Sequence, residues 1–316
     1  MIRMIQMWKY GRHAFKLLMT TAMLIGLGGI YAASPAPVVE AGPQAALPAG
    51  TLWSAGQETG DLSEWSLNDG GGIFNTGTGV ASATSSLANS GRNAAALTIS
   101  NAANATQAVR LFRWSEPRET PEAYYSIWLY FPQTYAPTSW WNIEQWKSKM
   151  SETINDPLWT LNVGNRSGQM YLYLYDWLNG ASVSQPTVHY LPVGKWFHLE
   201  TFYRQATDKT GQITMWQDGA KILDVSGVST KRVGDEVQWS VDNYTDGISP
   251  SDATIYLDDA VISTTRIGDP AAQPAAAAQP TATAQPTATA QPTATATANR
   301  DDDSQPRRHT QPRRHN

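Results

Sequence analysis

Residues 170–175 read Met-Tyr-Leu-Tyr-Leu-Tyr, and this alternation decides the fold class. Successive side chains of a β-strand point to opposite faces, so Met170, Leu172 and Leu174 are predicted to form an apolar face opposed by three tyrosines. Turn dipeptides such as Asp218-Gly219 separate further segments with the same period, at residues 124–131, 196–204, 212–217 and 254–262. Many short strands between turns predict an all-β protein, a two-sheet jelly-roll sandwich.

The chain of 316 residues divides by composition into four parts. Residues 1–33 have a basic start and an apolar run with small residues at its end, which predicts a secretory signal peptide or an uncleaved anchor. Residues 34–50 read as a flexible leader, and 51–268 are predicted to form a single β domain. Residues 269–316 carry a six-residue Ala/Thr/Pro repeat that predicts a disordered tail. We therefore expect a secreted or cell-surface protein, with membrane contact only through an uncleaved N-terminal segment.

The composition excludes several classes of function. Cysteine is absent, which rules out disulfides, zinc–thiolate sites and thiol nucleophiles. Residues 51–268 carry 14 Lys/Arg and 22 Asp/Glu, a net charge of −8. Binding to nucleic acid or to anionic membranes needs clustered cations, so we expect neither partner. Twelve of the thirteen tryptophans lie between Trp53 and Trp239, whereas the whole chain has only six phenylalanines. The domain therefore has more tryptophan than a single core needs.

Four segments resemble the polysaccharide-lyase-like jelly rolls of the heparin-lyase and alginate-lyase type, within the concanavalin A-like superfamily. They are Gly-Gln-Glu-Thr-Gly-Asp-Leu-Ser-Glu-Trp at 56–65, similar to the family's first strand, the aromatic strand 124–132, the segment Ile-Glu-Gln-Trp-Lys-Ser-Lys at 143–149, and 191–218 with 254–262. The resemblance spans most of residues 51–268. It implies a polysaccharide partner, a monomer, no organic cofactor, and β-elimination as the reaction.

The segment 143–149 is the one specific to the lyases. Alternation places Gln145, Lys147 and Lys149 on one face, with Glu144 and Trp146 on the other. Elimination from a uronic acid needs a donor for the carboxylate, a base for the C5 proton and an acid for the leaving oxygen. Gln145 suits the first role. The resemblance places a His base where this chain has Lys147, which becomes a base only if its pKa falls by several units; we favour the reading that Lys147 contacts substrate as a cation, as Lys149 does.

The resemblance also implies roles for residues on other strands. Tyr244 matches the catalytic Tyr of a late strand, and an amphipathic tyrosine at a strand end is the equally weighted alternative. A substrate-binding Arg is implied near Arg110 and Arg113, of which only one can face the substrate, and we prefer Arg110. His189 is a further candidate to replace the missing base, whereas His198 is expected to be structural.

Two other catalytic arrangements are absent from the sequence. Retaining sandwich glycosidases carry the spacing Glu-x-Asp-x-x-Glu, because a nucleophile and an acid must flank the bond, and residues 51–268 contain no such triplet. A Gly-x-Ser-x-Gly nucleophile elbow is also missing.

A calcium site is implied by the resemblance. Related sandwiches pair an acid of the first strand with one of the last strand around Ca²⁺, which here are Glu58 and Asp258, beside Asp259. Calcium takes oxygen ligands, often carboxylates with backbone carbonyls. The ion would be structural, and solvated acids are the alternative.

The aromatic surplus indicates sugar binding. Pyranose rings stack on flat aromatic faces, and exposed aromatic strips mark binding surfaces. We expect the substrate-contacting set to include Trp141, Tyr171, Tyr173 and Tyr175. The sequence thus predicts a uronate polysaccharide lyase; the alternatives are a non-catalytic carbohydrate-binding module and an adhesive surface protein.

Overall fold

A computed structural model describes residues 47–268 except 101, 103–104, 115, 117–120 and 150–155. The predicted signal segment 1–33, most of the leader 34–50 and the predicted tail 269–316 lie outside the described residues. Within the described part, no helix is both long and apolar enough to cross a membrane.

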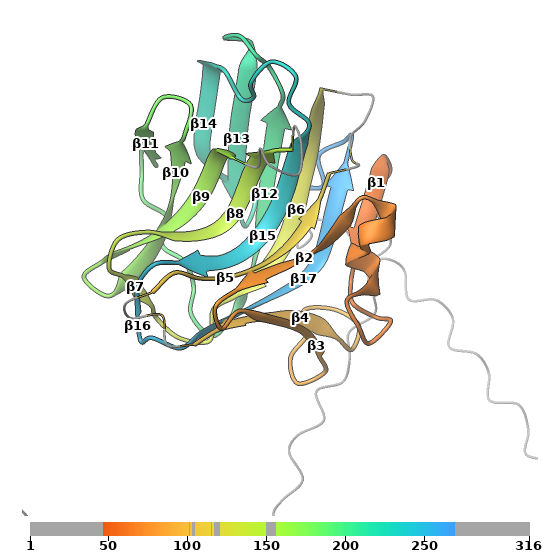
Figure 1. Ribbon diagram of the computed structural model, residues 1–316, viewed down its shortest axis with the longest axis vertical. Coiled ribbons are helices and arrows are strands. Elements are labelled where there is room, and N and C mark those ends of the chain that lie inside the picture. The colour runs from red at the N-terminus through yellow and green to blue at the C-terminus, as the bar shows by residue number, and fades with distance from the viewer. Residues whose placement is uncertain are drawn as a thin grey trace, which may run out of the picture.

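Two antiparallel sheets form the domain (Figure 1). The first has the order β14-β13-β12-β6-β17-β4-β3, with β1 paired to β17. Its strands are β1 Thr51–Ala55, β3 Val80–Thr84, β4 Ala94–Ile99, β6 Glu122–Tyr130, β12 Trp196–Arg204, β13 Gly211–Gln217, β14 Ala220–Val228 and β17 Ala253–Ser263.

The second sheet has the order β11-β10-β9-β8-β15-β5-β2 and carries the candidate site. Its strands are β2 Gly71–Thr76, β5 Gln107–Arg113, β8 Trp141–Ser148, β9 Pro157–Arg166, β10 Gln169–Asp176, β11 Ala181–Ser184 and β15 Val237–Thr245. A two-stranded ladder of β7 (Ala136–Pro137) and β16 (Ile248–Ser249) and two 3₁₀ turns, Ser63–Trp65 and Leu67–Asp69, complete the described elements.

The core lies between the sheets, and alternation explains which side chains reach it. Met170, Leu172 and Leu174 are buried in it as predicted, and Trp146 packs there against Tyr203 with ring centroids 4.9 Å apart. The predicted strand 212–217 lies in β13, which pairs with β14 across the predicted turn Asp218-Gly219. His198 is buried, and its Nε2 lies 2.6 Å from Ser126 Oγ, which is a structural contact. The predicted all-β sandwich is confirmed.

The first strand differs from the prediction in its position. β1 ends at Ala55, and the segment 56–65, expected to resemble the first strand, is a loop that ends in the 3₁₀ turn Ser63–Trp65. Trp65 enters the core from this turn and meets Trp53 edge-on at 4.5 Å. The loop bends because Glu64 accepts hydrogen bonds from the backbone N–H groups of Gly56 and Gln57, at 3.4 and 2.6 Å.

Strand β8 is irregular, and this irregularity positions the site. Its pairing with β9 shifts register between Asn142 and Glu144, and its pairing with β15 shifts opposite the same residues. Ile143 lies in the core cluster, and Glu144, fully buried beside Thr201 and Trp239, also points inward. A β-bulge of this kind puts two successive residues on one side and reverses the alternation beyond it. Asn142 therefore shares a face with Gln145.

Candidate functional site

Polar side chains gather on the face of the second sheet that points away from the core. Residues directly opposite each other in an antiparallel pair lie on the same face. Asp242 of β15 lies opposite Arg110 of β5, and Tyr244 of β15 lies opposite Asn142 of β8. Earlier in β15, Ser240 and Gln238 lie opposite Gln145 and Lys147 of β8. We call this set the polar face: Arg110, Asn142, Gln145, Lys147, Asp242 and Tyr244. The structure thus brings together four of the predicted site residues, Arg110, Gln145, Lys147 and Tyr244.

Lys147 is largely buried in the polar face, and its surroundings lower the pKa of its ammonium group. Burial lowers the pKa of Lys147 to about 8, and the positive charge of Arg110 acts in the same direction. Asp242 and Asp156 oppose this decrease. A substantial fraction of Lys147 is therefore an uncharged amine at mildly alkaline pH, which is the state that a base requires.

Asp242 is the acidic member of the polar face, and it is not among the site residues predicted from the sequence. It is 0% exposed, and burial raises its pKa to about 6, while Arg110, Ser240, Lys147 and Gln145 oppose that rise. Among the described residues, neither of its carboxylate oxygens has a hydrogen-bond partner of good geometry, nor have Nε and Nη1 of Arg110. Burying charged groups without hydrogen-bond partners costs free energy. The opposite charges of Arg110 and Asp242 offset part of this cost, and a bound ligand could offset more.

Tyr244 is half-buried at the rim of the polar face. Burial raises the pKa of its phenol, and Arg110 acts against this increase. Trp140 meets its ring edge-on at 4.8 Å, which fixes the direction of the phenol. At neutral pH the resting group is a phenol that can donate a proton.

Hydrogen bonds connect the polar face to the neighbouring strand. Gln145 Nε2 donates to Asn142 Oδ1 at 3.2 Å, and Asn142 Nδ2 donates to Asn162 Oδ1. Asn162 Nδ2 donates in turn to the backbone oxygen and hydroxyl of Thr160, at 3.2 and 3.1 Å. The chain of amides fixes which way each carboxamide points.

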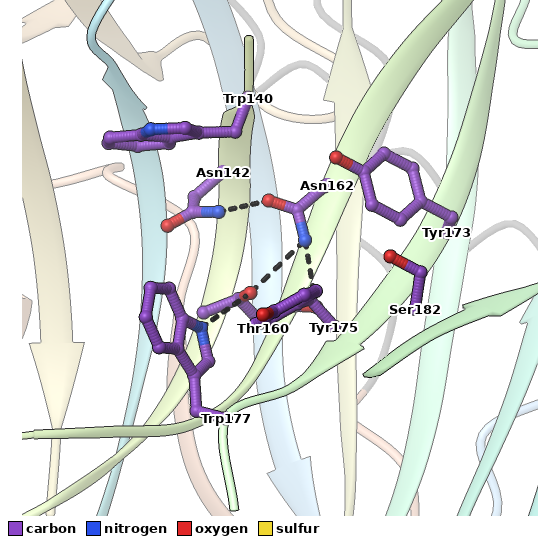
Figure 2. Close-up of a pocket in the computed structure, with 8 residues that line it drawn as sticks. All are labelled: Trp140, Asn142, Thr160, Asn162, Tyr173, Tyr175, Trp177 and Ser182. Atoms are coloured by element: carbon purple, nitrogen blue, oxygen red, sulfur yellow. Dashed lines mark hydrogen bonds between the residues drawn. The ribbon is translucent and has the colours of Figure 1, made fainter. Parts of the chain in front are cut away.

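A pocket of about 290 Å³ opens beside this network (Figure 2). In the close-up, Trp140 and Trp177 lie above and below the two asparagines, and Tyr173 and Tyr175 lie on the side toward β11. Trp177 Nε1 donates to Thr160 Oγ1 at 3.2 Å. We call it the neutral pocket, lined by Trp140, Asn142, Thr160, Asn162, Tyr173, Tyr175, Trp177 and Ser182.

The prediction that Trp141 contacts substrate is wrong. Trp141 is 0% exposed, packs edge-on against Phe131 and Tyr135, and donates from Nε1 to Asn243 Oδ1 at 2.9 Å. Alternation counted from Gln145 puts Trp141 outward, but the bulge at Ile143 and Glu144 reverses the faces. Its neighbour Trp140 lines the pocket instead.

The other predicted substrate contacts occupy different parts of the same sheet. Tyr173 and Tyr175 line the neutral pocket. Tyr171 lies further along β10 against Gly164, where a Cβ would come within 2.5 Å of the ring, so only glycine leaves room for it. Lys149 follows the end of β8, with Nζ 3.2 Å from the centre of the Trp114 ring.

His189 and Arg113 lie away from the polar face. Tyr190, next to His189, pairs with Tyr171 on the side of β10 that faces away from β9. Tyr190 is therefore three strand positions from β8, or about 14 Å at the usual strand spacing. His189 is therefore not brought beside Lys147, where it would have to lie to replace the base. Arg113 points to the other side of β5, over Trp53, and binds Glu116, as the three-residue spacing from Arg110 requires.

Glu58 and Asp258 hold one loop from two sides. Glu58 Oε1 accepts from the backbone N–H groups of Arg92 and Asn93, and Asp258 Oδ2 accepts from those of Asn89 and Ser90. Carboxylate oxygens suit Ca²⁺. Burial, and after it the charge of the neighbouring Asp259, raise the pKa of Asp258 to about 8. Within the described residues, no three His, Asp or Glu side chains cluster where they could hold a metal ion.

Comparison with known proteins identifies the family. A polysaccharide lyase family model matches residues 57–261. The chain belongs to the polysaccharide lyase family. The match includes Glu58, Asp258 and every residue of the polar face.

Solved structures agree with this family assignment at the level of the fold. An endo-β-1,4-glucuronan lyase from the fungus Trichoderma reesei superposes with a TM-score of 0.52 at 17% identity, over 68% of this chain and 96% of that one. The cellulose-induced protein Cip1 (0.49, 18%, 68% and 98%) and an alginate lyase from Aplysia kurodai (0.48, 11%, 69% and 100%) are also similar. No curated protein sequence matches the chain.

Proposed function

We propose that this protein cleaves a uronic-acid-containing polysaccharide by β-elimination. The proposal rests on one observation: Arg110, Gln145, Lys147 and Tyr244 lie on the same face of the sheet. Together they offer donors for the carboxylate, a base for the C5 proton and an acid for the leaving oxygen. Membership of the polysaccharide lyase family supports the same reaction class.

Arg110 and Gln145 would bind the C5 carboxylate. A guanidinium with two unpartnered N–H groups and a carboxamide held by Asn142 are suited to a planar anion. Neutralising this carboxylate makes the C5 proton more acidic, because the charge that develops on removal of the proton spreads onto it.

Lys147 and Tyr244 would then divide the proton transfers. The neutral amine of Lys147 takes the C5 proton, the C5 electron pair forms the C4–C5 double bond, and the C4–O bond breaks with its electrons on oxygen. The phenol of Tyr244 protonates that oxygen. The lowered pKa of Lys147 and the raised pKa of Tyr244 favour this assignment over a purely cationic contact by Lys147.

The test is ultraviolet absorbance of the conjugated double bond formed on uronate polymers. We expect Tyr244→Phe to lower kcat by about 10²- to 10⁴-fold with little change in KM, as expected for loss of a proton donor. Tyr256→Phe is the matched control, because Tyr256 lies on β17 of the other sheet and should keep full turnover.

A non-catalytic binding module is the competing outcome. A uronate polymer in the gel would slow the migration of such a module, but no double bond would form on any polymer. The Tyr244→Phe variant would bind the polymer with unchanged affinity. That combination of results would reject the lyase reaction.

We also propose that the protein acts outside the cell as a monomer, and that Ca²⁺ joins Glu58 to Asp258. Support for export comes from the sequence of residues 1–33, and support for calcium from the two carboxylates that grip the loop 89–93. The metal would tie the first loop to the last strand in a domain without cysteine.

A further inference from the structure

The two ends of the site differ in charge. At one end Arg110, Lys147 and Lys149 bring three cations together with aromatic rings, since Arg110 lies 4.4 Å from the centre of the Phe74 ring and Lys149 covers Trp114. At the other end, none of the eight residues that line the neutral pocket is charged. A polymer with a carboxylate on every unit would place one of them where no cation receives it.

We propose that the neutral pocket binds an uncharged pyranose next to the uronate that reacts, so that the substrate combines uronate with neutral sugar units. This inference rests on the proposed elimination reaction and adds the class of polymer to it.

The pocket is close enough to hold the adjacent unit. Asn142 lines it and pairs across the sheet with Tyr244, and Thr160 lines it and pairs with Gln145. One strand spacing, about 4.8 Å, therefore separates the pocket residues Asn142 and Thr160 from Tyr244 and Gln145. Its volume of about 290 Å³ is at the lower end for small-ligand sites, which fits one sugar unit and no longer segment.

The lining suits a sugar without a charge. Trp140, Trp177 and the two tyrosines offer flat faces for the C–H side of a pyranose. The amides of Asn142 and Asn162 and the hydroxyl of Ser182 both donate and accept, which suits sugar hydroxyls or an N-acetyl group. A carboxylate taken into this pocket would lose water without gaining a cation, and this desolvation is costly.

The first experiment compares polymers on the full chain. Turnover is measured by absorbance on polyglucuronate and on an unsulfated polymer that alternates glucuronate with an N-acetylhexosamine. We expect kcat/KM to be at least about tenfold higher on the alternating polymer. Equal or faster turnover on polyglucuronate would overturn the inference and leave the elimination reaction standing.

The second experiment changes the charge of the pocket. Ser182→Lys adds a cation on the exposed strand β11 and should shift the preference toward polyglucuronate by about tenfold. Ala181→Lys is the matched control, because Ala181 is equally exposed on the same strand, precedes Ser182 and does not line the pocket. An identical substrate ratio in the two variants contradicts the inference.

The third experiment separates this inference from the reaction. Trp177 is 49% exposed, so Trp177→Ala should fold and should weaken retardation by the alternating polymer in affinity gels, with little effect on polyglucuronate. If no polymer yields a double bond, the elimination reaction fails, and this binding difference still decides the pocket. Equal weakening with both polymers would reject a neutral-sugar site.

Discussion

At the scale of single residues, Asp242 and Lys147 influence each other's protonation against the larger effect of burial. The two lie on adjacent strands of one face, and each opposes the effect of burial on the other. With pKa values of about 6 and about 8, both groups are charged between these limits: as the pH rises, Asp242 loses its proton near 6 and Lys147 near 8. The pair thus places a general base near the pH at which proton transfer is most efficient.

A pH profile tests this arrangement. If Lys147 is the base, turnover on a uronate polymer rises as the pH passes through about 8, because the neutral amine accumulates. Asp242→Asn removes a charge that favours the ammonium, so the midpoint of this rise moves to lower pH. Tyr256→Phe on the other sheet is the control, since it leaves the charged groups of the polar face unchanged. Turnover that falls through pH 8 would show that Lys147 acts only as a cation.

At the scale of elements, the turn after β10 holds one wall of the neutral pocket. Asp176 Oδ1 accepts from the backbone N–H groups of Leu178 and Asn179, at 2.9 and 3.2 Å, and Oδ2 accepts from Asn179 Nδ2 at 2.7 Å. An aspartate that caps its own turn in this way fixes the backbone that follows it. Trp177 lies within this turn and is thereby aimed at Thr160.

Asp176→Ala should lower the free energy of unfolding by about 1–3 kcal/mol, because it removes a carboxylate that accepts two backbone hydrogen bonds and one side-chain hydrogen bond in a partly buried turn. Urea denaturation measures the loss. Asn179→Ala removes only the side-chain bond and should cost less, about 0.5–1.5 kcal/mol. Equal losses in the two variants would show that the backbone contacts of Asp176 do not hold the turn.

At the scale of the whole molecule, an acidic domain presents a cationic site. Residues 51–268 have a net charge of −8, yet the polar face carries the two cations Arg110 and Lys147 with one carboxylate, Asp242, and Lys149 follows the end of β8. The core between the two sheets, free of disulfides, carries the fold. Glu58 and Asp258 both accept hydrogen bonds from the loop 89–93, so a cation shared by them would add a link between the first loop and the last strand.

Calcium should raise the unfolding temperature of the whole protein. A ligand that binds only the folded state stabilises it by about 2.7 kcal/mol at a hundredfold excess over its Kd. Differential scanning fluorimetry with Ca²⁺, Mg²⁺ or a chelator measures the shift, and Asp258→Asn should abolish the response to Ca²⁺. The same unfolding temperature in calcium and in chelator would argue against the site.

The sequence by itself determined the sandwich and most of the polar face. Strand period is a local property, so alternation placed Leu172 and Trp146 in the core, and counting by two put Gln145 and Lys147 on one side. The family resemblance then supplied Arg110 and Tyr244. The same count applied to β15 could have found Asp242, which lies two residues before Tyr244 in the same strand.

Only the tertiary structure decided the rest. The bulge in β8 depends on pairing with two neighbouring strands, and it exchanged Trp141 for Trp140 and added Asn142 to the site. The neutral pocket joins β8, β9, β10 and β11, and the distance of His189 from Lys147 follows from the strand order. These features arise from contacts between segments far apart in the chain, which no local period encodes.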